Sequence, residues 1–320
     1  MSAKPANVRN AIERGFDFLE ETVDADGSWP SAMFMNPELT GTPRSERAPF
    51  VAALGCLSLR ECPGPRSERL RERTRAYLLS IMEYPGVWRY WPSLPPDLDD
   101  TAVCSLAVGE HPWLALGHTL PTVYRKRDRK GRFRTWMAKG DGTSEWDDID
   151  SVVNANVVVW LGDRAQTAGA QRWLGTLLDG RREAGSSRYY PDPMDLYAAL
   201  SRLGPEPTGV NDAFDGLGAV LAARILSCRD PSGNFGDEKR TAQALSALDR
   251  LQAWPAASEI ARSVGYLLET QCDDGSWPSG LVWQGPPPPN PPSVGFASEA
   301  LITAYCMESL ARLVRRGVIA

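Results

Sequence analysis

Hydrophobic residues recur along this chain at the three-to-four-residue spacing of amphipathic helices, and the helical stretches come in pairs. The first stretch of a pair carries many charged residues, as in residues 260–271 (IARSVGYLLETQ), and runs into an Asp/Gly turn and an aromatic residue. The second stretch is richer in Ala and Leu, as in residues 241–248 (TAQALSAL). Because small residues allow close helix packing, we expect the second helices to form an inner ring and the first helices an outer ring.

The pairs are copies of one repeat. Residues 18–30 (FLEETVDADGSWP) return as residues 266–278 (YLLETQCDDGSWP), and residues 86–91 (GVWRYW) resemble residues 131–136 (GRFRTW). Six aromatic markers, about 42 to 59 residues apart, define six units: Trp29, Trp88, Phe133, Tyr189, Phe235 and Trp277. The six second helices are expected to begin near Phe50, Asp100, Asp150, Asp195, Lys239 and Ser298. We therefore predict an all-α fold, an (α/α)6 toroid of six helical hairpins that takes up residues 1–320 as one domain.

Two stretches depart from the repeat. Residues 285–292 (GPPPPNPP) cannot form a helix, and we expect an extended loop inside the last hairpin, either a stiff crossing of one toroid face or a proline-rich ligand for another protein. Residues 124–134 (YRKRDRKGRFR) are the strongest basic run. This run is either a solvated loop or a site for a diphosphate.

Composition narrows the class of protein. The 320 residues are 42% hydrophobic and 23% charged, which is typical of a globular protein, and the net charge of −5 argues against a general nucleic-acid binder. There is no apolar run long enough for a transmembrane segment and no secretory signal, so we expect a cytoplasmic protein. The six cysteines contain no C-x-x-C pair and are expected to be free thiols.

The most specific motif is residues 97–102 (DLDDTA) at the start of the second inner helix. Asp97, Asp99 and Asp100 place three carboxyl groups within four residues. One interpretation is helix capping, in which the carboxylates accept hydrogen bonds from the free N–H groups of the first turn. The other is a functional cluster, because the start of an inner helix faces one mouth or cavity of the toroid.

The repeats from Arg9 to Trp29 and from Arg262 to Trp277 resemble the Gln-Trp repeat of squalene-hopene cyclases and related proteins. The DLDDTA motif resembles the D-x-D-D-T-A motif of class II terpene cyclases. The repeat is also similar to that of protein prenyltransferase β-subunits, but those use an Asp, Cys and His zinc site, and this chain has no late histidine for one. The resemblance therefore implies a single-toroid form of a class II terpene cyclase.

This resemblance implies a reaction that begins with protonation of a carbon–carbon double bond or an epoxide. It implies Asp99 as the proton donor, with Asp97 and Asp100 orienting or polarising it, and crowding of like charges raises the pKa of at least one of them. The carbocation that forms would be stabilised by aromatic faces. Candidates for that role are Trp88, Tyr90, Trp91, Trp136, Trp146, Tyr189 and Tyr190, each of which has packing between hairpins as its alternative role.

The next inner helix adds Asp150 and Asn154 as polar candidates for the cavity. We align Asp150 with Asp100, and Asn154 lies one turn further on the same helix face. In a functional role these two side chains would hydrogen-bond the acid, hold a water molecule or quench the final cation. In a structural role Asp150 would cap the helix and Asn154 would be a buried amide that is hydrogen-bonded to the backbone. Protonation requires no cofactor. Mg²⁺ would accompany a diphosphate substrate, although the Asp147-Asp148-Ile149-Asp150 spacing departs from the D-D-x-x-D of class I synthases.

The expected substrate is a linear isoprenoid, either a prenyl diphosphate or a prenylated small molecule. Class II cyclases commonly place the active site between this toroid and a second domain. We therefore expect either that a partner domain or a second copy completes the cavity, or that the substrate is small enough for a single ring. Two other functions fit the toroid. One is a glycosidase or lyase that uses Asp99 and Asp150 as paired carboxylates, and the other is a non-catalytic ring that binds an isoprenoid or a protein.

Overall fold

The computed structural model describes residues 5–110, 119–138, 148–206, 213–286, 290 and 293–317. Within these residues the outer and inner helices alternate along the chain. The outer helices are α1 (Pro5–Thr22), α3 (Pro65–Ser80), α6 (Thr119–Tyr124), α8 (Ala168–Asp179), α10 (Leu217–Ser227) and α12 (Ala257–Glu269). The inner helices are α2 (Pro49–Leu59), α4 (Leu98–Val108), α7 (Ser151–Leu161), α9 (Pro193–Ser201), α11 (Glu238–Arg250) and α13 (Glu299–Arg315). The inner helices begin within a few residues of the predicted positions.

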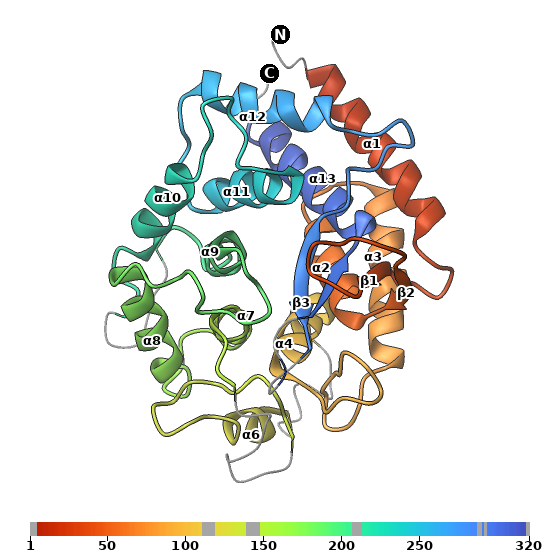
Figure 1. Ribbon diagram of the computed structural model, residues 1–320. Helices are drawn as coiled ribbons and strands as arrows, with labels where there is room; N and C mark the ends of the chain where they lie inside the picture. The colour runs from red at the N-terminus through yellow and green to blue at the C-terminus, as the bar shows by residue number, and fades with distance from the viewer. Residues whose placement is uncertain are drawn as a thin grey trace.

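The inner helices form a closed ring. Contacts run from α2 to α4, α7, α9, α11 and α13, and α13 packs back against α2 (Figure 1). The outer helix α1 packs on α13, α12 and α3, so the beginning and the end of the described chain lie side by side. The repeat thus produces the six-hairpin toroid that its spacing predicts.

Side-chain caps fix where the inner helices begin. The side chains of Asp97, Asp150, Asp192, Asp237 and Ser298 each accept a hydrogen bond from a backbone N–H in the first turn of the helix that follows. Such a cap satisfies donors that have no partner within the helix. The capping residue therefore places the first-turn side chains at one mouth of the ring.

A second hydrogen bond recurs between four of the six aromatic markers and the inner helices that follow them. The backbone N–H of the aromatic residue donates to a side-chain oxygen about one turn into the helix, and the pairs are Trp88 with Thr101, Phe133 with Asn154, Phe235 with Thr241, and Trp277 with Thr303. The aromatic side chains of these pairs are buried. In these four hairpins the marker residue thus ties the turn to the inner helix of its own hairpin.

The all-α prediction is wrong, because four short strands form an antiparallel sheet in the order β2-β1-β4-β3. They are β1 (Pro30–Phe34), β2 (Arg44–Arg47), β3 (Leu281–Gly285) and β4 (Val294–Ala297). Each pair of strands is inserted between the aromatic marker and the inner helix of the first or the last hairpin. Because the ring closes, these two insertions are neighbours, and β1 pairs with β4, with Met33 opposite Phe296. The proline-rich stretch joins β3 to β4, and its residues 287–289, 291 and 292 lie outside the described residues.

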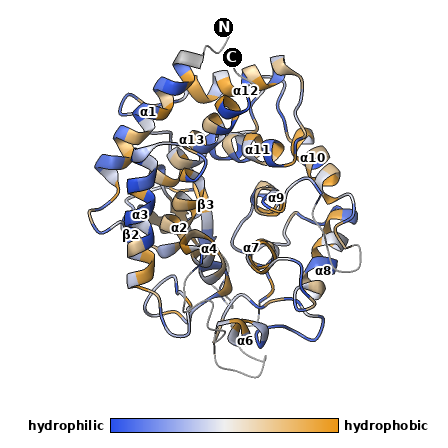
Figure 2. Ribbon diagram, turned by 180° about the vertical axis from the view of Figure 1, so that it is seen from behind, coloured by the Kyte–Doolittle hydropathy of each residue, from blue (hydrophilic) through white to orange (hydrophobic). Residues whose placement is uncertain are grey.

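Hydrophobicity differs between the two rings. In Figure 2 the inner helices α7 and α9 show mostly hydrophobic residues, whereas α3 shows many hydrophilic ones. Almost every residue of α4 and α7 is buried, while α3 buries only Ser67, Leu70, Thr74 and Leu78. In the part of the chain that the structure describes, no helix is both long and apolar enough to span a membrane.

Candidate active site

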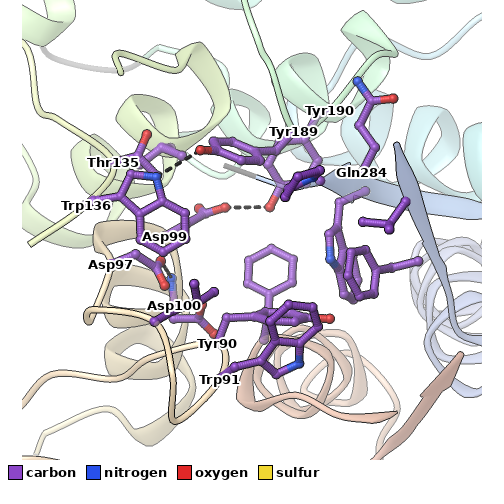
Figure 3. A pocket seen from close by; sticks show the side chains of 18 residues that line it. Tyr90, Trp91, Asp97, Asp99, Asp100, Thr135, Trp136, Tyr189, Tyr190 and Gln284 are labelled. Carbon is purple, nitrogen blue, oxygen red and sulfur yellow. Dashed lines mark hydrogen bonds between the residues drawn. The ribbon is translucent and has the colours of Figure 1, made fainter. Parts of the chain in front are cut away.

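The three aspartates of the DLDDTA motif lie at the start of α4 and face one pocket (Figure 3). Asp97 is the N-cap, and its Oδ1 accepts the backbone N–H of Asp100 at 2.7 Å. Asp97, Asp99 and Asp100 are only 3%, 8% and 3% exposed. Capping and clustering are therefore both present in the same motif.

The segment before α4 is held by the turns of two hairpins. The backbone N–H of Asp97 donates to the carbonyl of Trp88 at 3.2 Å, and that of Leu98 donates to the carbonyl of Thr135 at 2.7 Å. Asp97 also forms an isolated β-bridge with Trp136. These backbone contacts set the position of the acids relative to the aromatic residue at 136.

Aromatic and aliphatic side chains make up most of the pocket lining. The volume of the pocket, including the part that is open to solvent at its mouth, is about 750 Å³. Its walls come from the starts of the inner helices α2, α4 and α7, from the turns that precede inner helices and from the sheet. Besides the three aspartates, the lining residues are Phe50, Tyr90, Trp91, Leu94, Thr135, Trp136, Val153, Tyr189, Tyr190, Trp283, Gln284, Gly285, Pro286, Val294 and Phe296. The sheet thus supplies part of the pocket wall, for which a partner domain or a second copy was one of the expected sources.

Asp99 is the acid with defined donors on both oxygens. Its Oδ1 accepts Nδ2–H of Asn156 at 2.7 Å, and its Oδ2 accepts the hydroxyl of Tyr190 at 2.5 Å. Burial raises the pKa of Asp99 to about 7; the Tyr190 and Asn156 hydrogen bonds partly offset this, while the Asp97 and Asp150 charges add to it. Close to neutral pH, Asp99 therefore exists in both the protonated and the ionised form.

Asp97 and Asp100 form a coupled pair beside it. Burial raises the pKa of Asp97 to about 6, and burial together with the charges of Asp97 and Asp99 raises the pKa of Asp100 well above its usual range. Among the described residues, no lysine, arginine or histidine forms an ion pair with any of the three acids, whereas such pairs occur elsewhere in the ring. Protons, rather than counterions, therefore balance the charge of this cluster.

Aromatic rings face these acids across the pocket. Tyr90 lies 5.1 Å from Trp91 and 5.3 Å from Phe296 between ring centroids, and Trp283 stacks on Phe296 at 5.4 Å. The indole N–H of Trp91 donates to Glu46 at 2.9 Å. A wall of this kind offers π-faces to a cation and contains no strong nucleophile.

A second group of aromatic residues lies beside the acids. The indole N–H of Trp136 donates to the hydroxyl of Tyr189 at 2.9 Å (Figure 3), and the Tyr189 hydroxyl also forms a hydrogen bond with Asp148. Five of the seven predicted aromatic side chains thus line the pocket: Tyr90, Trp91, Trp136, Tyr189 and Tyr190. Trp146 lies outside the described residues.

Three of the predicted residues lie outside the pocket lining. Trp88 is 1% exposed and donates its indole N–H to the carbonyl of Leu78 at 2.8 Å, as expected of packing between hairpins. Both oxygens of Asp150 are used by donors at the start of α7 and in residues 187–189. Asn154 bonds both backbone groups of Phe133 at 2.8 Å. The caps align Asp150 with Asp97 rather than with Asp100, which puts Asn154 at the position of Thr101.

Sequence reasoning missed Asn156 and the sheet residues. Asn156 lies three positions after the pocket residue Val153, so the two side chains share a helix face. Asn154 directly follows Val153, and its side chain is therefore turned about 100° away from that face. The available signal was a second asparagine in an apolar helix, since a buried amide requires a partner. Phe50, Trp283 and Phe296 carried no such signal, because each reads as an ordinary core residue.

Other features lie away from the site. In the basic run 124–134 only Phe133 is fully buried, no residue lines the pocket, and Arg132 pairs with Asp128 at 2.7 Å. Within the described residues, no group of three or more His, Cys, Asp or Glu is arranged to hold a metal ion.

Comparison with known proteins identifies the fold. No protein-family model matches the chain, and no curated protein matches it. Among solved structures it is similar to the type II terpene cyclase MstE from Scytonema, with 18% identity, a TM-score of 0.74, and coverage of 97% of this chain and 99% of that one. It is also similar to a protein from Actinoplanes, with 19% identity, a TM-score of 0.75, and coverage of 96% and 99%.

A more distant likeness is to a possible GH105 family member from Salmonella enterica, with 13% identity, a TM-score of 0.58, and coverage of 97% and 94%. The match to the MstE chain extends over almost the whole length of both chains. The chain therefore has the helical-ring fold of type II terpene cyclase MstE.

Proposed function

We propose that this protein is a protonation-initiated, class II terpene cyclase that acts on a prenylated small molecule, with Asp99 as the general acid. One observation carries the proposal. Asp99 is a buried carboxyl group with a pKa near 7, has no counterion among the described residues, and faces an aromatic pocket. An acid of this kind holds its proton near neutral pH and delivers it to an apolar substrate away from water.

The reaction follows from these groups. The π electrons of an alkene of the substrate take the Asp99 proton, so that a C–H bond forms, the O–H bond breaks and a carbocation results. The remaining Asp99 carboxylate accepts hydrogen bonds from Asn156 and Tyr190. A second alkene then attacks the cation and closes a ring, and loss of a proton gives a cyclic isomer. Each aromatic face stabilises the cation by about 0.5–2 kcal/mol.

The comparisons support the substrate class. Variants of MstE have been solved with geranylgeranyl dihydroxybenzoate, named as substrate, and with merosterolic acid A, named as product. In this chain, the described pocket lining contains three carboxyl groups and no cationic side chain. A diphosphate would bring its negative charge next to those acids, so a prenylated small molecule is the better match. If a diphosphate is used, Mg²⁺ would accompany it.

The alternative functions have less support. A glycosidase with Asp99 and Asp150 as its pair needs both carboxyl groups in one pocket, and the Asp150 oxygens are taken by backbone and serine donors. A non-catalytic ring would leave Asp99 exposed and normally ionised, but Asp99 is buried and its pKa is raised.

The test is turnover of geranylgeranyl dihydroxybenzoate by the wild type and by Asp99→Asn, followed by mass spectrometry. Asparagine keeps the shape of the side chain but holds no transferable proton, so we expect at least a hundred-fold loss of the cyclised product. The matched control is Asp237→Asn at the exposed cap of α11, which retains a good cap and should retain activity. Full activity in Asp99→Asn would refute the assignment of the acid.

A further inference from the structure

Arg202 approaches the acid from the side of the ring opposite the substrate pocket. It is the C-cap residue of α9, half-buried, and its Nη1 donates to Oδ1 of Asn156 at 3.3 Å. On the other side, Nδ2 of Asn156 donates to Oδ1 of Asp99 at 2.7 Å. Asn156 is 2% exposed, so one buried amide connects the guanidinium group to the carboxyl group.

The chemistry of these groups permits one arrangement. A guanidinium group has only donors, so it must face the amide oxygen of Asn156 and never the amide nitrogen. The NH₂ of Asn156 is then directed at Asp99, where an acceptor is needed. A donor that is itself polarised by a cation on its oxygen side forms a stronger hydrogen bond in a low-dielectric interior.

The hydrogen bond to Asn156 is a direct side-chain contact of Arg202. Arg202 forms no ion pair among the described residues. The charge of Arg202 helps to lower the pKa of Glu308 on α13, but Glu308 forms its ion pairs with Arg250 and with Arg312. Arg202 thus acts on Glu308 through its charge alone, whereas it contacts Asn156 directly through a hydrogen bond.

We propose that Arg202 is a positioning residue for the acid: it fixes the Asn156 amide so that the amide N–H holds the Asp99 carboxylate left after proton transfer. This inference rests on the proposed role of Asp99. It explains how a carboxylate without a direct counterion is stabilised at the moment it forms. By favouring the ionised form, the Arg202–Asn156 pair also lowers the pKa of Asp99 and so strengthens the acid.

Other charged and titratable groups also face this pair. Asp97 before α4 and Asp150 before α7 raise the pKa of Asp99, the Tyr190 hydroxyl lowers it, and the charge of Asp99 in turn raises the pKa of Asp100. On the Arg202 side lie Tyr305 and Glu308 of α13 and Arg250 of α11. A test must therefore separate Arg202 from these neighbours and measure Asp99 itself.

The experiment is a pH titration of the Asp99 carboxyl carbon by NMR in protein labelled with [4-¹³C]aspartate. The Asp99 signal is assigned by its loss in Asp99→Asn, and no substrate is needed. In Arg202→Met we expect the titration midpoint to move to higher pH by roughly half a pH unit or more. In Asn156→Ala we expect a larger move, and the double variant should move no further than Asn156→Ala alone.

The control is Arg164→Met, which removes an exposed arginine just after the end of α7 and should leave the midpoint unchanged. If Arg202→Met does not fold, Arg202→Gln keeps a polar side chain of similar length without the charge, and the same move is expected. An unchanged midpoint in the folded Arg202 variant would overturn the inference. Retained activity in Asp99→Asn would instead overturn the proposed function, so the two failures are distinguishable.

Discussion

Helices α4 and α9 both begin with an aspartate at the N-cap and another three residues later, Asp97 and Asp100 in α4 and Asp192 and Asp195 in α9. Asp195 is buried, but its carboxylate lies 2.8 Å from Nζ of Lys239 on α11 and accepts a hydrogen bond from Gln243 at 2.9 Å. Asp100 has only Asp97 and Asp99 as its charged neighbours on α4.

The aspartates of α4 and α9 differ in the side chains that the next inner helix places beside them. Next to α9, helix α11 supplies Lys239, whose ammonium group also contacts the carbonyls of Leu281 and Val282 at 3.3 and 3.4 Å. The Asp195–Lys239 pair thus supports β3, which carries part of the pocket wall. Next to α4, helix α7 supplies Val153 and Asn156 and no cation. The same capping pattern gives a structural ion pair in one place and a group of proton-holding acids in the other.

Burial outweighs the helix dipole in the acid cluster. A helix N-terminus favours a carboxylate by about 0.3–1 kcal/mol, up to about 2 when partly buried, which would lower the pKa. The pKa values of Asp97, Asp99 and Asp100 are raised instead, because desolvation is the largest effect on each. One pKa unit corresponds to about 1.4 kcal/mol, so a value near 7 for Asp99 is a substantial cost to the ionised form.

The largest expected effect comes from breaking the ion pair. Lys239→Met leaves the Asp195 carboxylate buried without a counterion, and we expect the free energy of unfolding at pH 7.5 to fall by about 3–5 kcal/mol. Chemical denaturation measures it. The loss should shrink at pH 5, where Asp195 can take up a proton.

The control for that experiment is Lys130→Met at an exposed position, which should change stability by no more than about 0.5 kcal/mol. If Lys239→Met were as stable as Lys130→Met, Asp195 and Asp100 would not differ in their need for a cation, and the comparison would fail.

The second-largest expected effect comes from the acid cluster. There, removal of the charge is expected to increase the free energy of unfolding rather than decrease it. The pKa of Asp99 is raised from 3.8 to about 7, so its contribution to stability is present below pH 4 and is lost as the pH rises through 7. Asparagine does not ionise. The stability of Asp99→Asn relative to wild type should therefore rise by about 2–3 kcal/mol between pH 5 and pH 8. Denaturation curves at both pH values test this, and a difference that does not change with pH would show that Asp99 is ionised throughout.

The smallest effect sharpens the description of Asp99 itself. Tyr190→Phe keeps the ring in the pocket but removes a hydrogen bond to the ionised form, so we expect a loss of about 1–2 kcal/mol at pH 8 and little change at pH 5. The matched control is Tyr189→Phe, whose hydroxyl contacts Asp148 and not Asp99. Equal pH dependence in the two variants would contradict the assigned hydrogen bond.

The helical ring could be predicted from the sequence because each hairpin repeats the same cap, turn and aromatic residue. The sheet could not. Its strands have four or five residues, and two of them flank a proline-rich stretch that masks the hairpin. They pair only because the ring brings the first and last hairpins together, which is a long-range consequence of closure.

Local spacing also limited the prediction of the site. The DLDDTA motif located the acids, since clustered carboxyl groups are costly unless they are used. The choice of Asn154 over Asn156 depended on which face of α7 meets the cavity, and that face is set by packing against α4 and α9. Trp88 and Trp91 belong to the same short motif, yet only the latter reaches the pocket.

The most direct test of the central claim is turnover of geranylgeranyl dihydroxybenzoate in D₂O, with the product returned to H₂O before mass spectrometry. Because Asp99 exchanges its proton with solvent between turnovers, protonation of an alkene should leave one deuterium bound to carbon in each cyclised molecule, and Asp99→Asn should give no such product. A cyclised product without carbon-bound deuterium would contradict the account, because ring closure would then not begin with a proton from Asp99.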